Sequence, residues 1–214
     1  MSLGLVMTNI FDQYYQQYDQ WYVANKWAYL SELEAIKKLL PQKGKSLEIG
    51  VGTGRFAAPL GIDIGIDISE NMLRVASQRG VNTILGNAER LPFPVRTFDY
   101  VAIIVTICFV QSPLKTLLET ARVLKDKGKV IVGIIDKDSV LGKFYQKEKK
   151  SLFYKYAHFF SVQEITDLLK LAGFNSFSYY QTLFQPPLQM DSIEEPLDGY
   201  GKGGFVVICA QKSK

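Results

Sequence analysis

The residues with the clearest chemical potential form a glycine-rich turn, with Gly50, Gly52 and Gly54 directly after an apolar run. Glycine permits positive φ and lets a ligand approach the backbone closely. A helix that begins at this turn points its free N–H groups and its positive dipole end at the same ligand. The turn therefore suits a carboxylate, a phosphate or a polar sugar, although such clusters also occur as purely structural turns.

The spacing of the glycines argues against two familiar phosphate sites. The dinucleotide fingerprint is G-x-G-x-x-G, whereas this turn reads G-x-G-x-G and continues with Arg55. The phosphate-loop signature, which ends in Gly-Lys-Ser or Gly-Lys-Thr, is absent from the turn as well. Arg55 itself is open to two interpretations, pairing with a carboxylate or extending from a short helix into solvent.

Polar residues after the next two apolar runs point to a nucleoside. Asp67 ends the second run, where a carboxylate can accept hydrogen bonds from both hydroxyls of a ribose. The alternative is a helix cap, but Ser69 fits that role better. After the third run, Asn87 and Ala88 offer a side-chain amide and a backbone N–H to the edge of an adenine ring. Together these residues predict a site for an adenosine-containing ligand.

These residues need a scaffold that brings the ends of several strands together. Apolar runs predict strands at 46–50, 62–67, 81–85, 98–105 and 129–135, with helical segments between most of them. This alternation indicates βαβ units, in which the carboxyl ends of parallel strands share one edge. The predicted fold class is therefore α/β, with a doubly wound, Rossmann-like, mostly parallel sheet and helices on both faces.

The segments on either side extend this core. Helices are predicted over 9–22 and 26–40, and the aromatic side chains of the first suit either a lid or a helix docked on the sheet. A lysine-rich helix is predicted over 138–154, with lysines that either face solvent or attract an anionic substrate. A capping box at 161–164 starts a helix that ends at Gly173.

Two late strands, 174–184 and 205–210, are separated by a loop of about twenty residues. We expect a single domain over 1–214. Its parts are N-terminal cap helices over 1–44, a cofactor-binding core over 45–135, and a lid or substrate region with the final strands over 136–214.

The composition limits the classes of partner. The formal charge of +4 is too small to indicate nucleic acid binding, and no apolar run is long enough to span a membrane. Cys108 and Cys209 both lie in apolar runs and are expected to be buried thiols in a reducing compartment. With no signal peptide visible, a cytoplasmic protein is expected. Neither a metal site nor an oligomeric state is indicated.

Four motifs in order resemble the class I S-adenosylmethionine-dependent methyltransferases. They lie at 48–54, 65–69, 86–93 with 98–99, and 124–128. The chain is most similar to the broad subgroup of ubiquinone- and menaquinone-biosynthesis and other small-molecule methyltransferases, over 11–173 and into the final strands. The resemblance implies S-adenosylmethionine as cofactor, a small-molecule methyl acceptor, and a seven-stranded sheet whose last strand is antiparallel.

The resemblance also implies roles for individual residues. The glycine turn would line the methionine part of the cofactor, with Glu48 beneath the turn. Met72 would pack near the adenine, and Ala88 would donate its backbone N–H to it. Asn87 stands where the family usually has Asp, and its oxygen can still accept from the adenine amino group. The full implied set is Tyr18, Glu48, Gly50, Gly52, Gly54, Asp67, Ile68, Met72, Asn87, Ala88 and Glu89.

The sequence contains no evident acid–base pair. An enzyme that uses a sulfonium methyl donor mainly has to align the acceptor atom and exclude water. A general base is required only for some acceptors. Cys108 and Phe109 make the acceptor end apolar where many relatives carry polar residues. His158 and Tyr14 are the candidates for a catalytic group. For His158 the favoured alternative is packing among aromatic side chains, and for Tyr14 the alternative is contact with the cofactor carboxylate.

Two other functions fit part of the pattern. A non-catalytic cofactor-binding protein on the same fold would keep the glycine turn and Asp67. A nicotinamide-dependent oxidoreductase would share the ribose carboxylate but requires a different glycine spacing.

Overall fold

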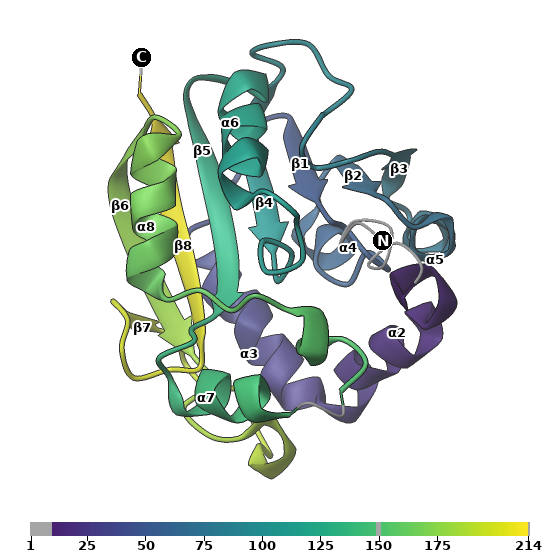
Figure 1. The fold of residues 1–214 in the computed structure, drawn as a ribbon, viewed down its shortest axis with the longest axis vertical. Helices are drawn as coiled ribbons and strands as arrows, with labels where there is room; N and C mark the ends of the chain where they lie inside the picture. The colour runs from purple at the N-terminus through teal and green to yellow at the C-terminus, as the bar shows by residue number, and fades with distance from the viewer. Residues whose placement is uncertain (1–9, 149–150, 214) are drawn as a thin grey trace.

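The computed structural model describes residues 10–148 and 151–213, and Figure 1 shows them as a twisted sheet between helices. The sheet has eight strands in the order β3-β2-β1-β4-β5-β8-β6-β7. Five neighbouring strands are parallel: β1 (Ser46–Ile49), β2 (Ile64–Asp67), β3 (Asn82–Leu85), β4 (Phe98–Ile104) and β5 (Leu124–Ile135). The predicted parallel core is confirmed.

The late strands complete the sheet in the expected arrangement. β8 (Phe205–Lys212) lies between β5 and β6 (Phe174–Thr182) and is antiparallel to both. The sheet has eight strands where seven were expected, because β7 (Leu197–Asp198) pairs with the outer edge of β6. β7 lies in the long loop between β6 and β8 and adds one short strand to the seven that were expected.

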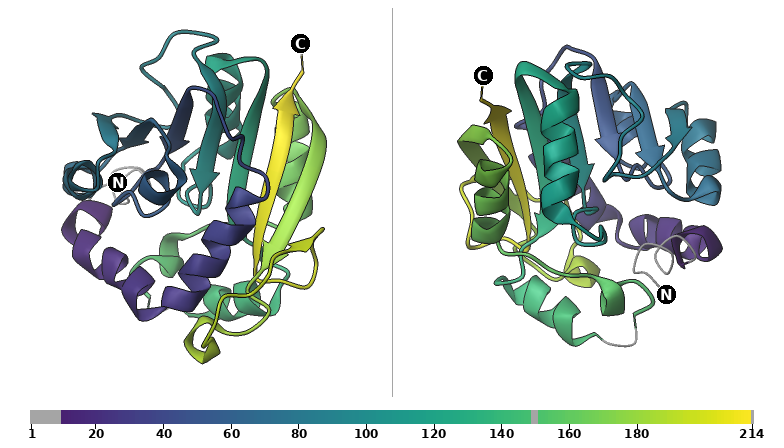
Figure 2. Two further views of the ribbon diagram at one scale, coloured as in Figure 1. Left: turned by 180° about the vertical axis from the view of Figure 1, so that it is seen from behind. Right: turned by 45° about the horizontal axis from the view of Figure 1, so that its top comes forward.

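Helices cover both faces of the sheet, as Figure 2 shows. On one face lie α6 (Pro113–Val123) and α8 (Val162–Leu171), and on the other α3 (Lys26–Lys37), α4 (Ala57–Leu60) and α5 (Glu70–Gln78). Alternate residues of β4 serve the two cores: Tyr100 and Ala102 pack on the α3 side, Val101 and Ile103 on the α6 side. β4 is apolar on both faces for this reason.

Local signals start the helices where the sequence predicts. Ser69, Ser112 and Ser161 each accept a hydrogen bond from a backbone N–H three residues on, and Ser161 forms the predicted capping box with Glu164. The crossover from β1 to β2 is compressed as expected, since α4 is a single turn of four residues.

The N-terminal helix α2 (Tyr15–Ala24) lies across the carboxyl ends of the parallel strands in Figures 1 and 2. Asn9, which the sequence places in this region, is outside the described residues. Among the described residues, no helix has the length and apolar composition needed to cross a bilayer. Cys108 is half-buried and Cys209 is buried, both as free thiols.

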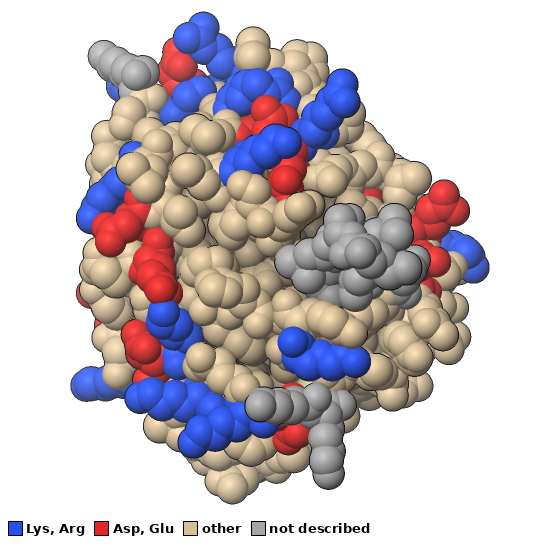
Figure 3. All heavy atoms as spheres, in the orientation of Figure 1, with Lys and Arg blue, Asp and Glu red and all other residues tan. Residues whose placement is uncertain are grey.

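The lysine-rich segment contains α7 (Val140–Lys147). Lys143, Lys147 and Lys155 are exposed, and Figure 3 shows basic side chains gathered at the lower left, where Figure 1 places α7. This favours the solvated-face interpretation for these lysines. Lys149 and Lys150 fall outside the described residues.

Candidate active site

Two adjoining cavities lie at the edge where the parallel strands end. The first, the glycine-turn cavity, has a volume of about 110 Å³, and the second, the aromatic cavity, about 480 Å³. Tyr18, Val105 and Phe109 line both. Nine of the predicted cofactor residues line the first cavity: Tyr18, Gly50, Gly52, Asp67, Ile68, Met72, Asn87, Ala88 and Glu89. The sheet edge is the usual ligand position in open α/β folds.

The three glycines of the turn all have positive φ, but their surroundings give them different structural roles. A Cβ at Gly50 would overlap the side chain of Thr106, and a Cβ at Gly54 would lie 3.1 Å from Cα of Ala76 in α5. A Cβ at Gly52 would meet only Tyr18, at 3.6 Å, and the sulfur of Met72, at 4.0 Å. Gly54 therefore serves helix packing, while Gly52 keeps the backbone open to a ligand.

Asp67 is held in place by the backbone of the turn it faces. Its Oδ2 accepts from the N–H of Gly52 at 2.9 Å, and its Oδ1 accepts from the N–H of Ser69 at 3.0 Å. Burial raises the pKa of Asp67, and these backbone donors act in the opposite direction. Each oxygen keeps a further lone pair, so the carboxylate can still accept from two ligand hydroxyls.

Glu48 lies beneath the turn and does not line either cavity. It is buried, and burial raises its pKa well above the usual range, against a hydrogen bond from the backbone of Ala57. Its Oε2 has no hydrogen-bond partner among the residues that the structure describes. The carboxyl group thus supports the turn from below, at the start of α4.

The loop after β3 is braced by its own polar groups. Oδ1 of Asn87 accepts from the N–H of Glu89 at 2.7 Å, and Oε1 of Glu89 accepts from the N–H of Ser112 at 2.9 Å. Asn87 is exposed and Ala88 half-buried. The family resemblance assigns the amide oxygen of Asn87 to the adenine amino group. This oxygen already accepts one hydrogen bond, from Glu89, and keeps one lone pair for a ligand.

A partly buried ion cluster fastens α2 over the turn. Asp19 of α2 accepts from Arg55, with Nη2 to Oδ2 at 2.6 Å, from Arg79 at 2.8 Å, and from the hydroxyl of Thr53 at 2.6 Å. Burial raises the pKa of Asp19, but these three donors outweigh it and hold the pKa well below its usual range. Arg55 thus pairs with a carboxylate, and the N-terminal helix covers the turn.

Aromatic rings close the space between α2 and the two cavities. The Phe11 ring stacks on Phe153 at 5.4 Å between centroids and lies edge-on to Phe109 at 5.0 Å. The hydroxyl of Tyr18 is 2.8 Å from that of Tyr22. The sequence left a lid and a helix docked on the sheet as alternatives for the N-terminal aromatic residues. Phe153 falls in the helix predicted over 138–154, which is shorter in the structure, because α7 ends at Lys147 and Phe153 only caps the short 3-10 helix η1 (Tyr154–Tyr156).

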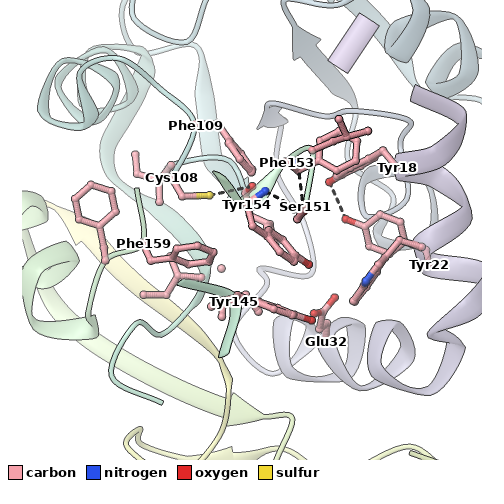
Figure 4. Close-up of a pocket in the computed structure, with 18 of the residues that line it drawn as sticks. Tyr18, Tyr22, Glu32, Cys108, Phe109, Tyr145, Ser151, Phe153, Tyr154 and Phe159 are labelled. Carbon is pink, nitrogen blue, oxygen red and sulfur yellow. Dashed lines mark hydrogen bonds between the residues drawn. The ribbon is translucent and has the colours of Figure 1, made fainter. Parts of the chain in front are cut away.

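The aromatic cavity is shown in Figure 4, with ring side chains from four segments of the chain pointing into it. Val105 and Leu183 line it with φ of 50° and 60°, a conformation that is costly for a β-branched residue such as Val105. Burial raises the pKa of the Cys108 thiol to about 12. Mostly apolar and aromatic side chains thus surround Cys108 and Phe109, and the role of this cavity as the acceptor end stays a prediction.

The two candidate catalytic residues lie outside both cavities. His158 is exposed, donates its backbone N–H to the carbonyl of Cys108 at 2.8 Å, and packs edge-on against Phe160. Tyr14 precedes α2 and is half-buried. Neither is among the lining residues, so a catalytic role for either stays a prediction without support from the geometry.

The chemistry of the glycine-turn cavity fits S-adenosylmethionine. The cofactor carries ribose hydroxyls, an ammonium and a sulfonium, which suit hydrogen-bond acceptors and negative charge. Asp67 and Glu89 supply carboxylates, Gly52 leaves the backbone accessible, and Ile68 and Met72 supply apolar surface for a base. The glycine turn and a strand end marked Gly52 and Asp67 in the sequence, whereas Ile68, Met72 and Glu89 were implied by the family resemblance.

Comparisons with known proteins agree with this geometry. The methyltransferase domain family matches residues 47–132. A crystal structure from Thermotoga maritima, described as a SAM-dependent methyltransferase and possible histamine N-methyltransferase, is 48% identical, with a TM-score of 0.94, over 97% of this chain and 100% of that one.

Two sequence relatives extend the comparison. An uncharacterized protein of Methanocaldococcus jannaschii is 47% identical over 205 residues, 95% of this chain and 99% of its own length. A demethylmenaquinone methyltransferase of Anoxybacillus flavithermus is 29% identical over 188 residues, 81% of this chain and 75% of that protein. The chain belongs to the class I S-adenosylmethionine-dependent methyltransferases, and S-adenosylmethionine is its cofactor.

Proposed function

We propose that the protein transfers a methyl group to a small molecule bound in the aromatic cavity. The observation that carries this proposal is the contact between the two cavities through Tyr18, Val105 and Phe109. A cavity of about 480 Å³ falls within the range of roughly 300–1,000 Å³ typical of small-molecule sites. Its position beside the cofactor site is the one that an acceptor needs.

The lining favours an acceptor with a ring or another apolar body. Most of the wall consists of aromatic and aliphatic side chains, including Trp21, Tyr22, Tyr154 and Phe159. The Thermotoga maritima structure is described as a possible histamine N-methyltransferase, and the Anoxybacillus flavithermus relative as a demethylmenaquinone methyltransferase. Histamine and demethylmenaquinone both contain a ring. Aromatic walls bind such bodies by burial and by edge-to-face contacts.

Methyl transfer from a sulfonium joins the acceptor lone pair to the methyl carbon while the S–C bond breaks and its electron pair stays on sulfur. The chain's residues hold and enclose the reactants. Asp67, positioned by the N–H of Gly52, holds the nucleoside end. The Asp19 cluster keeps α2 closed, so that Tyr18 separates the reacting atoms from water.

The cofactor end of the aromatic cavity offers little basic strength. Burial raises the pKa of Cys108 to about 12 and also raises the pKa of Tyr18 well above its usual value. Both groups therefore keep their protons at neutral pH. The acceptor atom then has to be nucleophilic in its own right, such as an uncharged amine, an imidazole nitrogen or a thiolate that forms in solution.

The test is a methyl-transfer assay with labelled S-adenosylmethionine and a panel of phenols, amines, thiols and carboxylates. Transfer to a small molecule, lost in Asp67→Asn, is the expected result. Label found only in added protein or nucleic acid would overturn the small-molecule proposal. Tight binding of S-adenosylhomocysteine, with no transfer to any acceptor, would favour a non-catalytic cofactor-binding protein instead.

A further inference from the structure

One buried acidic side chain faces the aromatic cavity and has no role so far. Glu32 lies on the buried side of α3 and is 2% exposed, yet it lines the cavity. Figure 4 shows it beside Tyr145 and Tyr22, on the opposite side of the cavity from Phe109. The glutamate thus lies across the cavity from Phe109, one of the residues shared with the cofactor site.

The carboxyl group of Glu32 is unpaired in the described part of the chain. Its Oε2 has no hydrogen-bond partner there, and no Lys or Arg is among the described residues that line the cavity. Burial raises the pKa of Glu32 to about 8, with no neighbouring charge to oppose it. Buried carboxyl groups in proteins are normally hydrogen-bonded or paired, so a partner from outside the chain would complete this one.

The surroundings of Glu32 select the charge of that partner. Burial raises the pKa of Tyr145 to about 12 and that of Tyr22 well above its usual range, and the Glu32 carboxylate adds to both effects. The rings of Tyr145 and Tyr154 stack with centroids 4.2 Å apart. Aromatic faces together with one carboxylate attract a cation, since ring quadrupoles and the negative charge act in the same direction.

We propose that Glu32 binds the ammonium group of an amine-bearing acceptor, with Tyr22, Tyr145 and Tyr154 around the cation. This proposal rests on the proposed function and names the substrate class of the same cavity. It assigns Glu32 to recognition of the acceptor, in ionic contact with the substrate and away from the cofactor.

A chemical consequence follows for the methylated atom. An amine held as ammonium has no lone pair, so it cannot attack the methyl carbon. Glu32 also lies across the cavity from Phe109, which borders the cofactor site. The acceptor therefore carries a second, nucleophilic atom that reaches the Tyr18 and Phe109 side while the ammonium stays at Glu32.

The test compares matched probes that differ only in their polar end. On phenyl, indolyl and hexyl bodies, the amine, the corresponding alcohol and the corresponding carboxylate are titrated calorimetrically into protein saturated with S-adenosylhomocysteine. The amine is expected to bind about ten- to a hundredfold more tightly than the alcohol on at least one body, as for a charge-assisted hydrogen bond. Absence of an amine preference on all three bodies would overturn the proposal.

Two variants separate recognition from stability. Glu32→Gln keeps the shape and removes the charge, and it is expected to abolish the amine preference. Glu34→Gln is the control, because Glu34 lies on the same helix but pairs with Lys37 at the surface. An amine preference that survives in Glu32→Gln would contradict the assignment, as would equal loss in both variants.

Cofactor binding is measured separately, so that the two proposals fail in different ways. If S-adenosylhomocysteine binds and small molecules are methylated without an amine preference, only the Glu32 assignment is wrong. 2-Phenylethylamine, whose amine is its single nucleophile, is expected to bind without being methylated. Methylation of its nitrogen by the wild-type protein would overturn the ammonium anchor while supporting the proposed function.

Discussion

Nη2 of Arg55 lies 2.6 Å from Oδ2 of Asp19, which joins the residue after the glycine turn to the helix that covers it. Arg79, which caps the C-terminal end of α5, approaches the same carboxylate, so two cations from the rest of the domain hold one acid of the lid. These side chains are 19–28% exposed, so loss of the carboxylate would leave two partly buried cations without a partner. The lid is thereby part of the folded core rather than an appendage.

Replacement of Asp19 by Asn tests this link. The change leaves two partly buried guanidinium groups without a carboxylate, and it is expected to lower the free energy of unfolding at pH 7 by about 1–3 kcal/mol. Binding of S-adenosylhomocysteine should weaken in parallel, because α2 carries Tyr18. The control is Asp167→Asn, which removes an exposed partner of Lys170. Equal effects of the two variants would contradict a special role for Asp19.

The same pair predicts a pH dependence. The pKa of Asp19 is lower in the folded protein than its ordinary value of 3.8. A carboxyl with a depressed folded-state pKa contributes stability above its unfolded pKa and loses that contribution as the pH falls. The difference in unfolding free energy between wild type and Asp19→Asn should therefore be largest near neutral pH and shrink below about pH 4. Urea titrations over this range measure it.

Alanine substitutions in the turn separate binding from packing. Gly52 has φ of 52° and Gly61 has φ of 66°, so Ala in either position carries a similar backbone cost, about 1–2 kcal/mol. A Cβ at Gly61 meets nothing within 4 Å, whereas a Cβ at Gly52 enters the ligand cavity. Gly52→Ala should lose at least tenfold in S-adenosylhomocysteine affinity, with Gly61→Ala unchanged. Calorimetry measures the affinity of the two variants, and thermal melts check that their stabilities are similar. Equal affinities of Gly52→Ala and Gly61→Ala for S-adenosylhomocysteine would contradict the assignment of this cavity to the cofactor.

Replacement of Asp67 by Asn should weaken the nucleoside contact. The amide keeps one acceptor for the N–H of Gly52 or of Ser69 but turns a donor toward the other. S-Adenosylhomocysteine affinity is expected to fall about ten- to a hundredfold, because hydrogen bonds to the charged carboxylate are lost. Asp198→Asn, on the exposed strand β7, is the control. Unchanged affinity in Asp67→Asn would argue against ribose binding at this carboxylate.

Glu32 predicts stability that falls with pH in the ligand-free protein. Its folded pKa of about 8 exceeds its ordinary value of 4.5, so the folded state keeps a proton that the unfolded state has released. The unfolding free energy should decrease between those values by about 1.4 kcal/mol per pH unit and then level off. Glu32→Gln should remove this slope, and Glu34→Gln should retain it. Parallel curves for wild type and Glu32→Gln would refute the buried ionisation.

Amine binding should release protons from the protein at pH 7. Free Glu32 is protonated there, and an ammonium ligand favours the carboxylate, so up to one proton leaves for each amine bound. The groups facing Glu32, Tyr22 of α2, Tyr145 of α7 and Tyr154, have raised pKa values and stay neutral. Titrations in buffers of different ionisation enthalpy measure this release. A heat that does not depend on the buffer would show that Glu32 is not the group that titrates.

Sequence patterns predicted the parts of this molecule that depend on local chemistry. Serine caps, glycines with positive φ and continuous apolar strands are signals confined to a few residues, so Ser69, Gly52 and β4 were found where the structure has them. The antiparallel direction of the last strand came from the family resemblance. β7 was missed because a two-residue strand has no periodicity to detect.

The remaining contacts depend on tertiary structure and gave no such signal. Asp19, Arg55 and Arg79 are far apart in sequence and meet only after α2 docks. Glu32, in contrast, has a signal in the sequence. It lies four residues from both Ala28 and Ile36, which is the spacing of residues on one side of a helix, and all three are on the buried side of α3. An acidic residue at that spacing marks a buried carboxyl, but only the cavity shows what it faces.

The position of Tyr18 has a kinetic consequence. One helix forms a wall of both cavities, so it cannot uncover the first and keep the second shut. A displacement of α2 that frees spent cofactor from the first cavity would therefore also widen the second. Asp19, through its pairs with Arg55 and Arg79, opposes that displacement, so one ion cluster restrains access for both ligands.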